Sequence, residues 1–146
     1  MGQLHELRLR SDAFISNMNV NIALSIEQNA KELVDMNKLQ LLVDSRDAEN
    51  KPLIHAKTGS QYLSLAYARR KKKSKPNLFD TGDFQKDMFM SVDENAMTWF
   101  IDSADRKSKF LVEIYGNIFG IFDNIRAKIL NFKSFSQLYK IKVLSK

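Results

Sequence analysis

The sequence contains no cysteine, only two prolines and two histidines, and no apolar run of the ~20 residues that a membrane-spanning helix needs. Without cysteine there is no disulfide framework, thiolate metal site or cysteine nucleophile. The histidines, His5 and His55, do not form a helical metal-binding pair. Residues 1–10 alternate polar and apolar side chains, which is not typical of a secretory signal. We therefore expect no metal, no cofactor and no membrane partner.

The glycines are also few, and their spacing excludes one further class of site. Gly82, Gly116 and Gly120 fit neither G-x-G-x-x-G nor G-x-x-x-x-G-K-[ST], the loops that hold nucleotide phosphates. We therefore expect no nucleotide-binding loop.

What the chain does have is enough apolar sequence for a folded domain, and a concentrated positive charge. Its 146 residues are 44% hydrophobic and 10% aromatic, too apolar for a disordered tail. The net charge of +6 equals the six bases within residues 69–75, so the rest of the chain sums to zero. That rest is polarised, because residues 76–123 hold four bases and nine acids whereas residues 124–146 hold six bases and no acid. These blocks can attract each other within a subunit or between neighbours.

Apolar residues at helical spacing predict a long N-terminal helix over residues 12–37. The recurring side chains are Met18, Ile22, Ile26, Ala30, Leu33 and Met36. Asn17, Asn19 and Asn21 are weak helix formers, which predicts irregular first turns. Residues 38–76 carry fewer apolar side chains and more turn signals, so we expect an extended basic loop there, of the kind that is either functional or disordered.

After this region the pattern changes to that of β-strands. Residues 84–92 and 97–102 predict a hairpin around the four-residue loop 93–96. Met97, Trp99 and Ile101 share one face of the second strand and Phe100 points to the other, so we expect the sheet to be covered on both sides.

The remaining segments complete an α+β prediction. A short helix over about residues 110–115 should follow Asp105 and end at Gly116, and a last helix should follow Asp123. Alternation in residues 139–143 predicts a closing strand. We expect one domain over residues 1–146, with a helix region at 1–37, a loop or arm region at 38–76, and a hairpin and helix core at 77–146.

One segment has the form of a catalytic motif. Residues 78–82, Leu-Phe-Asp-Thr-Gly, match the aspartic protease loop, in which two aspartates share a proton and activate water. A homodimer would have to supply the second aspartate. The alternative is a structural turn, in which Asp80 and Thr81 bond to nearby backbone and Gly82 supplies a positive φ.

The basic segment also allows two interpretations. Six cations within seven residues would bind phosphate groups with a strong salt dependence. Alternatively, the segment is a solvated loop tip. The six side chains are Arg69, Arg70, Lys71, Lys72, Lys73 and Lys75.

Five segments, residues 37–42, 44–53, 67–71, 76–84 and 111–121, together resemble the neck and tail-completion proteins of tailed bacteriophages, a group of head-tail connector and virion-morphogenesis proteins. The most recognisable elements are a lysine-rich loop that leads to a Leu-x-Asp-Thr-Gly-x-aromatic turn, and a later Phe-Gly crossing.

The resemblance implies a structural, non-enzymatic virion protein. Proteins of this kind form a ring that joins the portal region to the tail, as tail-completion or tail-terminator components assembled in the host cytoplasm. Their partners are copies of themselves, portal or adaptor proteins, tail proteins and packaged double-stranded DNA. The alternatives are a small basic nucleic-acid-binding protein and the homodimeric aspartic protease.

The resemblance also assigns roles to three groups of residues. Asp80, Thr81, Gly82 and Phe84 would fix the start of the hairpin. The six bases of residues 69–75 would form an arm that contacts a partner or the DNA lumen. A crossing between subunits would include Gly116, Ile118, Phe119 and Gly120.

Overall fold

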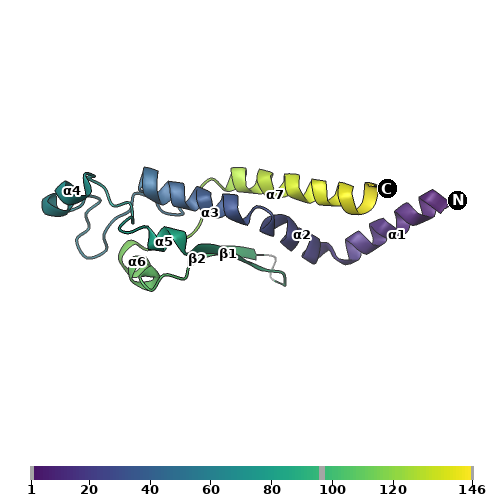
Figure 1. Ribbon diagram of the computed structural model, residues 1–146, viewed down its shortest axis with the longest axis horizontal. Coiled ribbons are helices and arrows are strands. Elements are labelled where there is room, and N and C mark those ends of the chain that lie inside the picture. Colours follow the sequence, from purple (N-terminus) through teal and green to yellow (C-terminus); the bar gives the residue numbers. More distant parts are fainter. Residues whose placement is uncertain (1, 96–97, 146) are drawn as a thin grey trace. The chain divides into compact units, whose positions relative to one another are not determined.

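The structure is a computed structural model that describes residues 2–95 and 98–145, and it confirms the α+β class (Figure 1). Met97 and Ala96, which we assigned to the second strand and its loop, lie outside the described residues. The elements are, in chain order, α1 (Gly2–Ser16), α2 (Met18–Glu27), α3 (Ala30–Leu39), η1 (Gln40–Asp44), α4 (Leu65–Lys71), α5 (Asp83–Lys86), β1 (Met88–Asp93), β2 (Thr98–Ser103), α6 (Ser108–Tyr115), α7 (Asn124–Tyr139) and η2 (Lys140–Leu144).

Packing divides the chain into two compact units, each built from segments that are distant in sequence. Unit 1 comprises Met1–Ala30, Ser91–Trp99 and Asn124–Lys146, and unit 2 comprises Lys31–Met90 and Phe100–Asp123. This division differs from the single domain, with boundaries near residues 37 and 76, that we expected. Sequence periodicity describes neighbours along the chain and carries no information on which distant segments pack together.

The predicted helix over residues 12–37 is wrong in extent and continuity, because helix begins at Gly2 and is interrupted twice. The first interruption is at Asn17, where φ is −107° and the side chain donates to the Ala13 carbonyl at 2.9 Å. Such local bonds compete with helical ones. The second is a turn at residues 28–29, where the Asn29 side chain donates to the Ser25 carbonyl at 2.9 Å.

The core of unit 1 joins the two ends of the chain. α7 packs along α2, and η2 packs on α1 (Figure 1). Phe14 of α1 is buried with Leu138 and Val143. Its ring also meets those of Phe135 and Tyr139 edge to face, with centroids 5.4 and 5.3 Å apart. Because edge-to-face pairs favour one relative orientation, these rings fix how α7 lies on α1.

The predicted closing strand at residues 139–143 is wrong, because α7 continues into the π-helical turn η2. In an α-helix, five residues separate two side chains by roughly 140°, so Val143 would leave the face that holds Leu138. The wider π-turn, closed by a Ser145 N–H bond to the Lys140 carbonyl at 2.7 Å, returns Val143 to that face. Both side chains are consequently buried.

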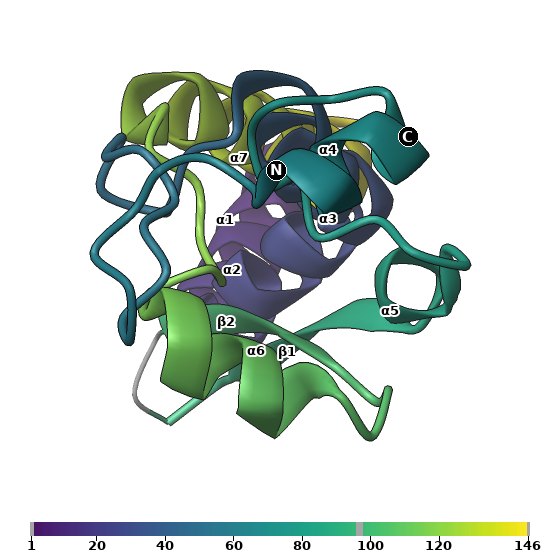
Figure 2. The same ribbon diagram turned by 90° about the vertical axis from the view of Figure 1, so that its left-hand side faces the viewer.

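Unit 2 is held by a small apolar core and has long connecting segments between short helices (Figure 2). Leu33, Leu41, Leu53 and Ile118 are its most deeply buried side chains. The extended loop expected over residues 38–76 is partly helical, because it contains η1 and α4.

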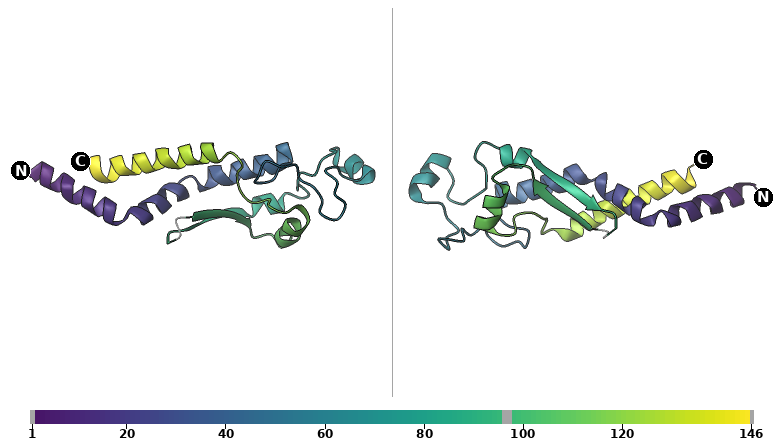
Figure 3. Two further views of the ribbon diagram at one scale, coloured as in Figure 1. Left: turned by 180° about the vertical axis from the view of Figure 1, so that it is seen from behind. Right: turned by 90° about the horizontal axis from the view of Figure 1, so that it is seen from below.

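The hairpin forms, and its two strands run side by side (Figure 3). Its first strand starts at Met88 instead of residue 84, because residues 83–86 form α5. Phe84 and Gln85 are adjacent and both buried, which strand alternation does not allow. The expectation of a sheet covered on both sides is also wrong, since Phe89 and Phe100 are exposed. None of the described helices has the length and apolar character to cross a membrane.

Candidate functional site

The basic residues 69–75 lie at the end of a short helix. α4 begins after Ser64, whose hydroxyl accepts a bond from the Tyr67 N–H at 3.4 Å. Three bases occupy its last turn, where the partial negative charge of the helix C-terminus favours cations. Lys72 then adopts a left-handed conformation, with φ of 53°, and ends the helix. The expected arm is therefore a helical projection followed by a turn.

Lys71 differs from the other five bases because its side chain points back into unit 2. It is 17% exposed, and its Nζ donates to the Phe79 carbonyl and, at 3.0 Å, to Asp80 Oδ1. The Arg70 guanidinium lies 4.6 Å from the centroid of the Tyr67 ring. Arg70 is exposed, and so are the other four bases, which form neither an ion pair nor a cation–π contact within the described chain: Arg69, Lys72, Lys73 and Lys75.

Asp80 is held as a carboxylate by two lysines. The Lys71 hydrogen bond, followed by the Lys71 charge, lowers the pKa of Asp80 below its ordinary value, with smaller contributions from Lys107 and Arg70. Lys107 Nζ lies 3.7 Å from the second carboxylate oxygen. An aspartic protease needs one carboxyl of its pair to keep a proton. The lysines oppose that protonation, so this geometry favours the structural turn.

The turn itself has the conformation that we expected of its glycine. Gly82 has φ of 93°, and a Cβ at this position would lie 3.2 Å from the Phe79 ring. The Thr81 hydroxyl donates to the Asp83 carboxylate. Phe84 is buried, with its ring centroid 5.8 Å from that of Phe119. These residues start α5, however, and the hairpin follows only after it.

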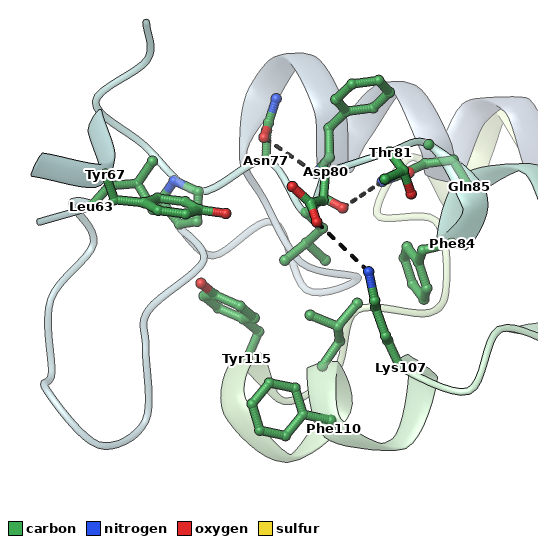
Figure 4. A pocket seen from close by; sticks show the side chains of 15 residues that line it. Leu63, Tyr67, Asn77, Asp80, Thr81, Phe84, Gln85, Lys107, Phe110 and Tyr115 are labelled. Atoms are coloured by element: carbon green, nitrogen blue, oxygen red, sulfur yellow. Dashed lines mark hydrogen bonds and ion pairs between the residues drawn. The ribbon is translucent and has the colours of Figure 1, made fainter. Parts of the chain in front are cut away.

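A cavity of about 280 Å³ lies beside this turn, within unit 2 (Figure 4). Asp80 and Lys107 form an ion pair at its edge, and Gln85 lies in its wall. The cavity is mostly aromatic and aliphatic, with Leu63, Tyr67, Pro76, Leu78, Phe79, Phe84, Phe110, Leu111 and Tyr115 in its lining. Burial, and to a lesser extent Tyr67, raises the pKa of Tyr115. Tyr67 of α4, the turn at Asp80 and the α6 residues thus meet at one site, which no local pattern indicates.

Two buried polar atoms near this site have no hydrogen-bond partner among the described residues, His55 Nδ1 and Gln85 Oε1. Gln85 nevertheless has a structural role, because its Nε2 donates to the Leu78 carbonyl at 2.9 Å and Leu78 has a positive φ of 54°. The His55 ring packs edge to face against Tyr115, with centroids 5.9 Å apart. No local sequence pattern indicates either role.

Part of the crossing assigned to a subunit interface packs inside unit 2. Ile118 is 0% exposed, so it cannot contact another subunit. The Asn37 side chain donates to the carbonyls of Ile118 and Gly120 at 3.1 and 2.8 Å. A Cβ on Gly120 would meet the Ala48 side chain at 2.9 Å. Of the expected crossing residues, Phe119 is half-buried and Gly116 is exposed.

Asn37 and Gln40 hold the fold through side-chain bonds to the backbone of other segments, and neither residue is among the predicted site residues. Gln40 Nε2 donates to the Asp47 carbonyl at 2.7 Å, and its Oε1 accepts from the Phe122 N–H at 3.1 Å. A signal was present, because Asn37 follows Leu33 by four residues and thus lies on the predicted apolar face. An amide on that face is a buried hydrogen-bonding residue.

Within the part of the chain that the structure describes, no three histidine, cysteine or acidic side chains lie close enough to hold a metal ion. Comparison of the chain with protein-family models, with curated proteins and with solved structures gives no match in any of the three.

Proposed function

We propose that this chain is a non-enzymatic structural subunit of a tailed-phage virion. It forms a ring in the neck or head-tail connector, as a tail-completion or tail-terminator component, and joins the portal region to the tail. Its partners are other copies of itself, portal or adaptor proteins, tail proteins and packaged double-stranded DNA. It is assembled in the host cytoplasm and resides in the virion.

The observation that carries this proposal is exposed apolar surface that is grouped on one element. In the described part of the chain, 23 large apolar side chains are exposed, and three of them, Ile125, Ile129 and Phe132, share one face of α7. Contiguous exposed apolar patches are typical of surfaces that contact other proteins. A subunit of a larger assembly requires such surfaces. The resemblance to connector proteins supports the same role, over residues 37–42, 44–53, 67–71, 76–84 and 111–121.

The experiment that tests this proposal is imaging of the assembled state. The purified chain should form closed rings by negative-stain microscopy and by native mass spectrometry, alone or with portal-like particles. In virions, the subunit should occupy a ring coaxial with the DNA. A chain that stays monomeric at all concentrations and does not attach to portal particles contradicts the proposal.

The second candidate function is nucleic-acid binding, which the four exposed bases at the end of α4 favour. Such contacts weaken steeply with salt. Salt-sensitive binding of the monomer to random duplex DNA, without rings, would support this alternative over the connector role.

The protease alternative has its own test. Asp80→Asn keeps the size of the side chain and its acceptor oxygen, so the turn should persist. If the wild-type chain cleaves peptides and this variant does not, the structural proposal fails.

A further inference from the structure

The outer face of α7 carries an apolar stripe that nothing in unit 1 covers. Ile125, Ile129 and Phe132 are 73, 51 and 72% exposed. At 100° per residue they lie within a narrow sector of the helix, with Tyr139 nearby. The buried side chains of α7, Ala127, Ser134 and Leu138, lie on the opposite side. α7 therefore packs on α2 with one face and presents a second apolar face outward.

The charges beside this stripe are all of one sign. Lys128 borders it on one side and Lys133 on the other, and both are exposed. Neither lysine has an ion-pair partner among the residues described. Residues 124–146 hold six bases and no acid. A surface that is apolar at its centre and acidic around it would complement this face.

The hairpin of the same chain presents a surface of that description. Phe89 of β1 and Phe100 of β2 are 45 and 54% exposed, while Met88 and Ile101 point to the buried face. Residues 87–103 hold four acids and no base. Asp87 and Glu94 are exposed at opposite ends of β1 and have no ion-pair partner within the described chain.

A groove continues from the aromatic side chains of this surface. It has a volume of about 360 Å³ and lies between β2 and α6. Phe100, Val112 and Phe119 supply its apolar lining, and Asp102 and Lys109 its charges. An isoleucine or phenylalanine from a partner helix would find apolar contacts here.

We infer that the α7 stripe of one copy docks on the outer hairpin face of a second copy. The inference rests on the self-assembly in the proposed function and names its contact. Phe132 and Ile129 pack against Phe89 and Phe100, and the lysines face the acids of the hairpin. The two surfaces are different, so the contact is heterologous and produces rings or filaments instead of isolated twofold dimers.

The absence of cysteine allows a direct test by disulfide trapping. Ile129→Cys and Phe100→Cys chains are mixed and oxidised, and the products are separated under non-reducing conditions. The yield of disulfide-linked heterodimer from the mixture should be much higher than the yield of homodimer from either variant alone. The control replaces Phe100→Cys by Lys31→Cys, an exposed position on α3. Homodimers of Ile129→Cys in excess, or equal yields with the control, would overturn the inference.

A charge exchange tests the same contact without covalent trapping. Lys128→Glu/Lys133→Glu chains, and separately Asp87→Lys/Glu94→Lys chains, should lose the high-mass species in native mass spectrometry. An equimolar mixture of the two should regain it, because each altered face then meets one of opposite sign. The quadruple variant should regain it alone. Circular dichroism confirms that each variant is folded.

The outcomes separate this inference from the proposed function. If wild-type rings form but trapping and charge exchange have no effect, the inference fails and the connector role stands. If both tests succeed but the product is open filaments, the contact stands and the connector role fails. A third outcome is that the chain binds anionic vesicles, and that Lys128→Glu/Lys133→Glu loses this binding but still self-associates. This outcome would assign the stripe to a lipid surface and overturn the inference.

Discussion

At the scale of single residues, Lys71 is the most informative side chain of the basic segment. The sequence places it among six equivalent cations, yet it alone is largely buried and bonded to the turn at Asp80. Lys71 thus helps to hold the turn at Asp80 in place, although a lysine within a run of bases is expected to be solvated.

Titration of Asp80 tests this pairing. Its pKa should lie below the ordinary aspartate value of about 3.9. Because the pKa is lowered in the folded state, the pair stabilises the fold fully at pH values above the ordinary aspartate pKa. This contribution to stability disappears as the pH falls through the lower pKa of the folded state. Lys71→Met should raise the pKa toward 3.9, and Lys107→Met should raise it less, as measured by carboxyl NMR shifts. An unchanged pKa in Lys71→Met would show that the pair is absent in solution.

Two glycines provide a matched test of the packing of the crossing. Gly120 has φ of 133°, and a Cβ added there would lie 2.9 Å from the Cβ of Ala48. Gly59 has φ of 64°, and a Cβ added there would have no neighbouring atom within 4 Å among the residues described. We expect urea denaturation to show a loss of about 2–5 kcal/mol for Gly120→Ala, from strain and overpacking together. Gly59→Ala should lose only about 1–2 kcal/mol, the cost of a left-handed alanine. Equal losses would argue against the contact with Ala48.

At the scale of elements, one α-helix in each unit ends in a π-turn: α3 continues into η1 and α7 into η2. Leu41 of η1 and Val143 of η2 are both buried. Leu41 follows Leu33 and Asn37 at ordinary α-helical spacing, whereas Val143 reaches the buried face of α7 only through the wider turn of η2.

The end of α7 distinguishes a helix from the strand that the alternation predicts. In a strand, Ile141 and Val143 would share a face. In η2, Val143 is buried and Ile141 is exposed. Val143→Ala should cost about 1.5–3 kcal/mol in thermal or urea unfolding, and Ile141→Ala should stay within about 0.5 kcal/mol. Similar losses for both variants would favour the strand.

Several elements were predictable, because their signals are local. The hairpin and the helix before Gly116 are confirmed, and so is the positive φ of Gly82. Other elements were not. The strand prediction failed at Phe84 and Gln85 because non-local contacts bury both side chains. Phe84 packs against Phe119, and Gln85 donates to the Leu78 carbonyl. The site was half predictable, since Asp80 and the bases carry motifs but Lys107 and Tyr115 do not.

At the scale of the whole molecule, the net charge of +6 describes two different populations of bases. Lys71 belongs to the fold, whereas Arg69, Lys72, Lys73 and Lys75 are exposed and lack ion-pair partners among the described residues. The exposed four account for most of the surplus and are available to an anionic partner.

Neutralising the exposed four bases separates folding from assembly. A variant with glutamine at all four positions should keep its unfolding temperature, because exposed substitutions change stability little. It should alter ring formation or attachment to portal particles, as counted by electron microscopy. Lys71→Gln is the control, which should lower the unfolding temperature. If rings form normally but salt-sensitive DNA binding is lost in the fourfold variant, the nucleic-acid-binding alternative gains support.

The order of segments in unit 1 has a consequence for synthesis. Phe14 is translated well before Leu138 and Val143, the side chains that cover it. A nascent or truncated chain therefore displays α1 without its cover, and the outer stripe of α7 exists only after residue 132 has been translated. Assembly through α7 would therefore include only chains that contain α7, and it would exclude shorter translation products from the ring.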